Sequence, residues 1–427
     1  APSQAAVLDV RGGREARVLT VAPGCGLREF AFDDVFGTQT TQDEVYCSVA
    51  GPLVSDFVNG LSSTLIVYGQ TGSGKTYTMF GEPLDGSSAV LTGDSRGVVP
   101  RVCEEVLEAL KVREEQGIDA RVAMSYVEVY GQEVFDLLRD GARVGQSRVA
   151  GQRYVLDGNC ETEFSNLTEV HELLRTGDSQ KRRAATAMNF NSTRAHTVVA
   201  LTLCQRNLEN GTEHTSRFLL ADLGGSEQLA KSKANEGMKD IGTTSWAEYY
   251  QARERVSEAT GINLGLFALK NCIDALNERQ VALKEGRRPP RVPYQDSKLT
   301  MLLSGALGGD ARTAVVVAGT LDSVHAPETI QTLRFGERCR GVENKASLNS
   351  ADLRAAVDEI DLQISMLESD IRRKERWETR REVRQDIEGE ETIATSVLVG
   401  AEAERAKLES ALRRRSVLLG DPQPDDR

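Results

Sequence analysis

The segment Gly69–Thr76 has the residue types and spacing of a phosphate-binding loop, G-x-x-x-x-G-K-[ST]. Glycines let successive backbone N–H groups turn toward phosphate oxygens, and the helix expected next adds the positive end of its dipole. Lys75 can reach the β- and γ-phosphates of a nucleotide, and the hydroxyl of Thr76 can bind Mg²⁺. The candidate nucleotide-binding residues are Gly69, Gln70, Thr71, Gly72, Ser73, Gly74, Lys75, Thr76 and Tyr77.

The residues on either side of the loop bear on this interpretation. Thr64–Tyr68 is apolar, which predicts a short buried strand running into the loop. The alternative, a glycine-rich turn with a chance lysine, does not explain why strand, loop and Lys-Thr pair follow one another. Tyr77 either stacks on an adenine base or packs as an ordinary helix aromatic. The pattern predicts nucleotide binding and leaves open what the energy is used for.

Two further polar segments narrow the choice of enzyme. Asn189–His196 reads N-F-N-S-T-R-A-H and precedes a predicted strand, and Asp222–Glu227 reads D-L-G-G-S-E directly after the apolar run Phe218–Ala221. An acidic residue at the end of a strand suits outer-sphere binding of Mg²⁺. A glycine beside it can bring its N–H to a phosphate with no Cβ in the way. These segments are candidates for sensing the terminal phosphate.

Together with the loop, these segments resemble the kinesin motor domain, whose two switches read N-x-x-S-S-R-S-H and D-L-A-G-S-E. Myosins and small GTPases share the phosphate loop but not the other matches. The resemblance extends from roughly Phe30 to Asn349. Further segments that are similar to the family are Phe30–Phe36, Gly97–Arg101, Ser125–Tyr130, Gly261–Asn263, Val292–Thr300 and Thr332–Arg338.

The resemblance implies roles in catalysis for four residues. Ser192 would help to position the attacking water, and the N–H of Gly225 would sense the γ-phosphate. Arg194 and Glu227 would form an ion pair that closes the site, and Glu227 would accept a proton through a second water. Such closure removes water and arranges charges around an in-line displacement.

The resemblance also implies the cofactors and the partner. ATP or ADP would bind with Mg²⁺, which Thr76 and Thr193 would ligate directly and Asp222 through water. Lys298 and Asn263 would lie on the side that binds microtubules. The sequence is thus interpreted as an ATP-hydrolysing microtubule motor in which γ-phosphate release moves the switch loops and the neck. The C-terminal neck indicates movement toward the plus end.

Two other functions remain as alternatives. A kinesin-like protein could bind microtubules as a scaffold with weak or no motility. A GTPase or a kinase could use the same loop, but the chain lacks an N-K-x-D base-reading motif and shows no substrate-binding constellation beyond the three segments.

Several positions depart from the family pattern. The strand ending in R-x-R-P that usually opens the domain is not found, and its loss would expose a sheet edge or leave a gap. Gln295 and Met301 stand where arginines are common, and Leu264 stands where lysine or arginine is common. Because tubulin is acidic, these changes predict weak, salt-sensitive or altered microtubule binding. Lys231–Arg255 is longer than usual and is either a filament contact or, as we expect from its polar composition, a disordered insertion.

Alternating apolar and helical patterns predict a three-layer α/β domain, and with the resemblance a P-loop NTPase fold. Its central sheet is expected to be mixed and mostly parallel, flanked by helices, with a helical segment at the C-terminus. We expect a kinesin-like motor domain over 1–345, a neck linker over 346–352, and a helical or coiled-coil neck or stalk start over 353–420. The seam of that last segment is Leu353, Val357, Ile360, Ile364, Leu367 and Ile371. It predicts a homodimer, or a helix that folds back or lies alone.

Composition sets further limits on the 427 residues. The net charge of −12 argues against general nucleic-acid binding, and the basic clusters Lys181–Arg183, Lys231 with Lys233, and Arg287–Arg291 are interpreted as solvated surface. No apolar run is long enough to span a membrane. The seven cysteines are odd in number and include no C-x-x-C pair, which indicates reduced thiols. We therefore expect the protein in the cytoplasm, on the cytoskeleton.

Overall fold

The computed structural model describes residues 8–11, 16–22, 26–82, 95–144, 148–150, 153–155, 161–187, 195–209, 211–226, 246–345, 364–374, 376–386, 389–401, 404–405 and 407–408. The chain divides into two compact units, Ala1–Ser347 and Leu348–Arg427. The predicted boundaries at 345 and 352 stay predictions, because 346–363 lie outside the described residues.

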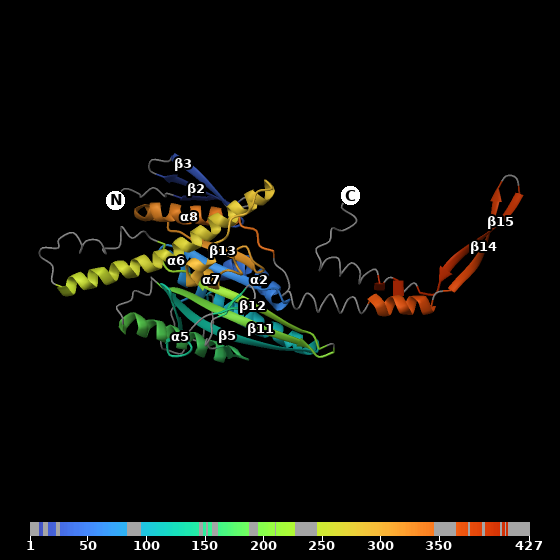
Figure 1. The fold of residues 1–427 in the computed structure, drawn as a ribbon, viewed down its shortest axis with the longest axis horizontal. Coiled ribbons are helices and arrows are strands. Elements are labelled where there is room, and N and C mark those ends of the chain that lie inside the picture. Colours follow the sequence, from blue (N-terminus) through green and yellow to red (C-terminus); the bar gives the residue numbers. More distant parts are fainter. Residues whose placement is uncertain are drawn as a thin grey trace. The chain divides into compact units, whose positions relative to one another are not determined.

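An eight-stranded mixed sheet forms the centre of the first unit (Figure 1). Parallel pairing is confined to β4 with its two neighbours β12 and β13. The remaining pairs are antiparallel, so the prediction of a mostly parallel sheet is wrong. The reason is local, because short hairpin turns such as the one at Gly131 join β5 to β6 and reverse the chain direction. The strands follow the order β13 (Arg312–Ala318), β4 (Ser63–Gly69), β12 (Glu213–Asp222), β11 (His196–Asn207), β5 (Ile118–Tyr130), β6 (Glu133–Asp136) and β7 (Ala142–Arg143), with β10 (Thr162–Glu163) paired to β5.

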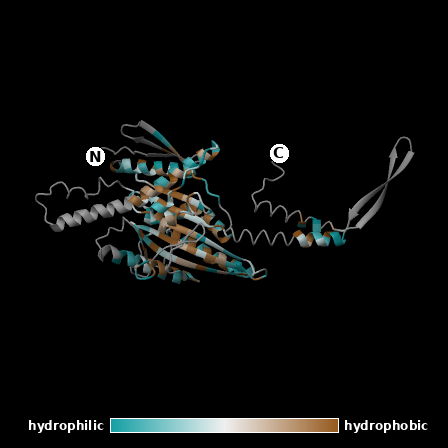
Figure 2. Cartoon of the chain, in the orientation of Figure 1, coloured by the Kyte–Doolittle hydropathy of each residue, from teal (hydrophilic) through white to brown (hydrophobic). Residues whose placement is uncertain are grey.

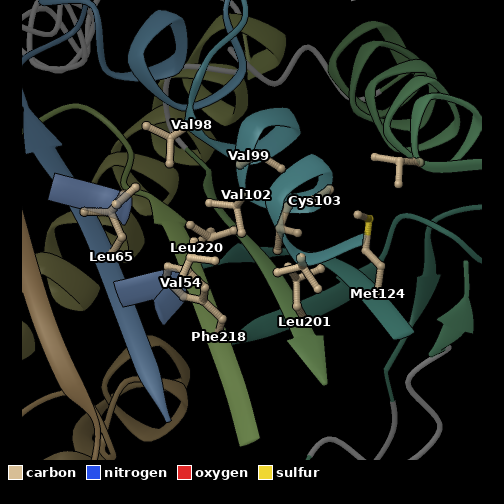
Figure 3. Close-up of a cluster of buried hydrophobic side chains, with 14 of the residues drawn as sticks. Val54, Leu65, Val98, Val99, Val102, Cys103, Met124, Leu201, Phe218 and Leu220 are labelled. Atoms are coloured by element: carbon tan, nitrogen blue, oxygen red, sulfur yellow. The ribbon is translucent and has the colours of Figure 1, made fainter. Parts of the chain in front are cut away.

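Helices cover both faces of this sheet, which gives the predicted three layers. Along β4 the side chains alternate, so that Leu65 and Val67 join one hydrophobic cluster while Ile66 and Tyr68 join the other. Figure 3 shows the first cluster, and Figure 2 shows hydrophobic residues gathered around the sheet. The first face is covered by α2 (Gly51–Val58), α4 (Val98–Glu115) and α5 (Leu167–Ala187), and the second by α6 (Trp246–Lys284), α7 (Lys298–Leu302) and α8 (Ala326–Arg340).

A small antiparallel sheet packs against α8. Its strands are β1 (Leu8–Arg11), β2 (Ala16–Ala22) and β3 (Gly26–Phe32). Val18 and Phe30 contact Ile330 and Leu333 in a third cluster. Among the described strands, β13 pairs with β4 alone and is one edge of the sheet.

The remaining short elements connect these layers. They are α1 (Gln42–Val45), a π-helical turn (Tyr46–Ala50), α3 (Lys75–Phe80), the hairpin β8 (Arg148–Ala150) with β9 (Arg153–Val155), and two 3₁₀ turns (Tyr294–Asp296 and Ser323–His325). No helix in the described ranges is long and apolar enough to cross a membrane.

Helix α6 begins earlier than the sequence predicted. It starts at Trp246, so residues 246–255 are helical rather than a disordered insertion, and Asn263 lies inside α6. Strong helix formers such as Ala247, Glu248 and Gln251 explain the extension, which Gly261 does not interrupt. The rest of the predicted insertion, residues 231–245, lies outside the described residues.

The second unit is only partly helical. Residues 364–374 form a helix that contains Ile364, Leu367 and Ile371 of the predicted seam. An antiparallel hairpin of β14 (Arg376–Asp386) and β15 (Gly389–Val399) follows, so the prediction of a helical segment over 353–420 is wrong for these residues. The β-branched residues of β15 favour a strand over a helix. Dimerisation through the seam stays a prediction.

Candidate nucleotide-binding site

Three glycines fix the shape of the phosphate loop between β4 and α3. Gly72 and Gly74 have φ angles of 80° and 95°, a region that side chains with a Cβ rarely adopt. A Cβ on Gly69 would lie 2.2 Å from the carbonyl oxygen of Ala318 at the end of β13. The loop conformation therefore excludes a side chain at Gly69 and favours glycine at Gly72 and Gly74.

Lys75 lies at the start of α3 and is almost buried, with 8% of its surface exposed. Its Nζ donates to the carbonyl oxygen of Gln70 at 2.7 Å, and the Ser73 hydroxyl donates to the same oxygen at 2.8 Å. The side-chain Oε1 of Gln70 is buried and has no hydrogen-bond partner among the described residues. The loop thus holds one ammonium group at its centre, where an anionic ligand would be attracted.

Asp222 meets the phosphate loop across the sheet. It ends β12, which runs parallel to β4 with Asp222 opposite Val67, so both strands end at the same edge. Thr76 Oγ1 donates to Asp222 Oδ2 at 2.6 Å. Burial raises the pKa of Asp222, opposed by the Thr76 hydrogen bond and by the charges of Lys181 and Lys75. Its Oδ1 has no partner within the described part of the chain, so this hydroxyl and carboxylate fit a divalent cation.

The backbone after Asp222 runs along the end of β4. The N–H of Leu223 donates to the carbonyl oxygen of Val67, and the N–H of Ser226 donates to that of Gly69, both at 3.1 Å. Gly225, between them, is buried. The structure therefore brings the predicted phosphate-sensing residue next to the loop.

His196 joins three elements and was not predicted as a site residue. It starts β11 and is buried, and its Nδ1 accepts a hydrogen bond of 2.9 Å from the N–H of Gly224, which places the proton on Nε2. A Cβ on Gly265 in α6 would lie 3.3 Å from that Nε2. Burial, and then the charge of Lys75, lowers the pKa of His196 to about 4, so the ring is neutral near pH 7. The sequence signal that could have identified His196 is its position as the last residue of the segment Asn189–His196, which resembles the first switch.

Lys181 was interpreted as part of a solvated surface, but the structure places it inside. Its side chain is 15% exposed, pairs with Asp178 at 3.5 Å, and lies 4.7 Å from the ring centres of both Phe80 and Tyr126. Its charge lowers the pKa of Asp222. One turn earlier, a Cβ on Gly177 would lie 2.1 Å from the Tyr126 ring. Gly177 and Lys181 therefore hold α5 against β5, just before the first predicted switch.

Tyr77 is 49% exposed, which argues against the alternative of a packed helix aromatic. Four predicted catalytic or metal-binding residues, Ser192, Thr193, Arg194 and Glu227, lie outside the described residues. The backbone of Asn263 lies in α6. Lys298 opens α7, after Ser297 caps the helix by accepting a hydrogen bond from the N–H of Thr300.

Comparisons with known proteins agree with this geometry. The model of the kinesin motor domain matches residues 20–342. Kinesin-related protein 3 of Dictyostelium discoideum is 35% identical over 81% of this chain and 27% of its own length. Kinesin heavy chain of Botryotinia fuckeliana is 33% identical over 80% of this chain and 36% of its own length. This chain therefore spans about a third of these relatives.

A solved structure agrees as well. It is described as "Structure of a fast kinesin: Implications for ATPase mechanism and interactions with microtubules". It superposes with a TM-score of 0.67 at 31% identity, over 80% of this chain and 87% of the other.

Proposed function

The chain belongs to the kinesin motor domain family, and on this premise we propose that it is a microtubule-stimulated ATPase. Release of the γ-phosphate would move its switch segments, α6 and the neck, and movement would be toward the plus end. The observation that carries the proposal is the 2.6 Å hydrogen bond between Thr76 in the phosphate loop and Asp222 in the second switch. It joins the two segments that a kinesin-type site needs at one edge of the sheet.

The proposed cofactors are ATP or ADP with Mg²⁺. When bound, Mg²⁺ would supply positive charge that offsets the negative charge of the phosphates. Thr76 and Thr193 would hold the metal directly and Asp222 would hold it through water, so the Thr76 hydroxyl would leave its present hydrogen bond to Asp222. Lys75 would exchange the carbonyl of Gln70 for the phosphates. The cation would also offset the burial that now disfavours the ionised form of Asp222.

The proposed chemistry is an in-line attack of water on the γ-phosphate. Ser192 would position that water, and Glu227, paired with Arg194, would accept its proton through a second water. The N–H of Gly225 would donate to the γ-phosphate. Because the neighbouring N–H of Ser226 is already fixed to the Gly69 carbonyl, little backbone rearrangement is needed to present this donor.

The described residues also support a route from this site to the neck. His196 touches the second switch at Gly224 and α6 near Gly265. Farther along α6, Asp274 pairs with Arg338 of α8 at 3.0 Å, and Asn277 donates to the Arg338 carbonyl oxygen at 3.0 Å. A shift of α6 would therefore reach the end of α8, which leads to the proposed neck. Coupling of this kind is reciprocal, so microtubules would change nucleotide affinity by the same factor.

We place the microtubule-binding surface on α6, α7 and the segment between them. Lys298 and Asn263 are the proposed contacts. Positive charge absent at Gln295 and Met301 is offset by four exposed basic residues, namely Lys284 at the end of α6 and Arg287, Arg288 and Arg291 in the segment that follows it. On α6, Leu264 and Phe267 are 43% and 60% exposed and add apolar area. Such a surface predicts salt-sensitive binding.

The second candidate function is a microtubule-binding scaffold with weak or no motility, which Leu264, Gln295 and Met301 favour. ATPase turnover measured with and without microtubules separates the two. The motor proposal expects stimulation by microtubules, and the scaffold expects none while co-sedimentation persists.

Glu227→Ala gives a sharper test of the same mechanism. It should still bind MgATP yet lose turnover, because the proton acceptor and the closing ion pair are gone. The matched control is Glu285→Ala, in the loop after α6, which should keep basal turnover. Normal turnover in Glu227→Ala would contradict its assigned role.

A further inference from the structure

Gln42 contacts the helix of the phosphate loop, although it lies outside both the loop and the two switch segments. It begins α1, only 7% of its surface is exposed, and its Nε2 donates to the carbonyl oxygen of Tyr77 at 2.7 Å. Tyr77 follows Lys75 and Thr76 directly in α3. A buried amide from an earlier part of the chain therefore holds the residue next to the proposed metal ligand Thr76.

This hydrogen bond is additional to those that α3 makes itself. The Tyr77 carbonyl oxygen also accepts the N–H of Gly81 at 2.8 Å, and a carbonyl oxygen has two lone pairs for two such donors. Because α3 has only six residues, it depends on tertiary contacts for its position.

The core holds only one side of α3. Met79 is fully buried in the first hydrophobic cluster. Tyr77 precedes it by two residues and so points from nearly the opposite side of the helix, where its side chain is 49% exposed. Gln42 therefore fixes α3 at the residue whose side chain the core does not hold.

Gln42 is itself held in place by its neighbours in α1. Thr41 caps the helix by accepting a hydrogen bond of 3.2 Å from the N–H of Glu44, and its own N–H donates to the Glu44 carboxylate at 2.7 Å. The residue after Gln42, Asp43, pairs with Arg101 of α4 at 2.7 Å. A side chain on a capped turn that is anchored to a second helix can hold its partner in one place.

The exposed ring of Tyr77 is suited to a nucleotide base. A base stacks on an aromatic side chain through the faces of the two rings, and the offset between the rings sets the strength of the contact. The backbone of Tyr77 must therefore stay in one position for the ring to meet the base well.

The groups proposed to meet the phosphates have other partners. Lys75 Nζ donates to the Gln70 carbonyl oxygen at 2.7 Å, and Thr76 Oγ1 donates to Asp222 Oδ2 at 2.6 Å. Neither of these bonds involves α1. Removing the amide of Gln42 should therefore affect the contact with the base and spare the contacts with the phosphates.

We propose that Gln42 is a positioning residue for the nucleotide base. It fixes the backbone of Tyr77, and thereby the place at which the Tyr77 ring stacks on the base. This role rests on the proposed function, because it requires a nucleotide at the phosphate loop.

The test compares a ligand that has a base with one that has none, MgATP and magnesium tripolyphosphate, by isothermal titration calorimetry on the full chain. Gln42→Leu keeps the buried bulk and removes the donor, so it should weaken MgATP binding about fivefold or more and leave tripolyphosphate binding unchanged. Tyr77→Ala should have the same selective effect. The double variant should bind MgATP about as weakly as Tyr77→Ala alone, because Gln42 acts through that ring.

Gln205→Leu is the matched control. Gln205 is 8% exposed on β11 and its Nε2 donates to the carbonyl oxygen of Val58 at 2.9 Å, so the substitution removes the same kind of bond elsewhere. It should bind both ligands like the unchanged chain, and thermal unfolding followed by circular dichroism checks each variant. In turnover assays Gln42→Leu should raise the KM for ATP more than it lowers kcat.

The outcomes distinguish the role of Gln42 from the proposed function. If the unchanged chain binds neither MgATP nor tripolyphosphate, both are overturned. The role of Gln42 alone is overturned if the unchanged chain binds MgATP and Gln42→Leu binds it as tightly as Gln205→Leu does. It is also overturned if Gln42→Leu weakens both ligands by the same factor, or if its effect on MgATP adds fully to that of Tyr77→Ala.

Discussion

The nucleotide end of the motor unit and its proposed microtubule-binding face follow the family pattern to different degrees. At the nucleotide end every fixed residue of the loop is present, from Gly69 to Thr76. On α6 and α7, three positions that commonly carry positive charge are Leu264, Gln295 and Met301.

The difference reflects two kinds of physical constraint. A Cβ on Gly69 would meet the Ala318 carbonyl at 2.2 Å, and Gly74 needs a left-handed backbone, so the loop admits no substitute. A surface that attracts an acidic filament depends on summed charge, which can be moved from one residue to another. Exposed Arg287 and Arg288 show where such charge lies in this chain.

The largest effect is expected from a substitution in the phosphate loop. Lys75→Ala removes the ammonium group at the centre of the loop, so the dissociation constant for MgATP should rise at least ~100-fold, or about 3 kcal/mol. Isothermal titration calorimetry measures it. Lys298→Ala, at the start of α7, is the control and should leave nucleotide affinity unchanged. If the dissociation constant for MgATP rose less than tenfold in Lys75→Ala, the claim that the phosphate loop is the more constrained of the two regions would be contradicted.

His196 should make stability depend on pH. Its folded-state pKa of about 4 lies below the ordinary value of 6.5, so between these values the unfolded chain binds a proton that the folded protein does not. Stability is then fully present above about pH 6.5 and falls as the pH drops toward 4, by about 2 kcal/mol between pH 7 and pH 5. Urea unfolding of the unchanged chain and of His196→Gln measures the difference. An identical pH dependence in both would contradict the assignment.

Lys181→Met should lower turnover about tenfold with little change in KM, because the charge that favours ionised Asp222 is lost. The pKa of Asp222 should rise further, so the acid side of the pH–rate profile should move to higher pH. Lys181→Arg keeps the charge and should restore most of the activity. If Lys181→Met lowers turnover without moving the profile, the residue acts on packing alone.

The smallest effect is expected on the filament face. Replacing Arg287 and Arg288 by alanine should weaken microtubule binding about fivefold at low salt and reduce its salt dependence, with basal ATPase unchanged. Co-sedimentation over a salt series measures this. The matched control replaces Arg121 on β5 and Arg206 on β11. Both are exposed and lie near the end of β11 that is opposite His196. If both double variants lost the same microtubule affinity, binding would depend on the net charge of the chain and not on Arg287 and Arg288.

Local patterns predicted much of the nucleotide end. The strand before Gly69 and the position of Asp222 at the end of β12 are confirmed, because each is set by neighbours in sequence and by the direction of parallel strands. The burial of Lys181 was missed because it depends on Phe80 and Tyr126, which are distant in sequence.

Composition misjudged one other segment and periodicity misjudged a second. The start of α6 at Trp246 follows from helix propensity that its polar composition obscured. In the second unit, β-branched residues of β15 favoured a hairpin over the predicted helix.

The central claim is that contacts with the γ-phosphate are linked to the microtubule-binding face. The most direct measurement is the microtubule affinity of the chain by co-sedimentation at one salt concentration, with MgADP and with a magnesium complex of a non-hydrolysable ATP analogue. The claim predicts affinities that differ about fivefold or more between the two nucleotides, and no difference in Lys75→Ala. Equal affinities in the unchanged chain, with both nucleotides bound to saturation, would contradict it.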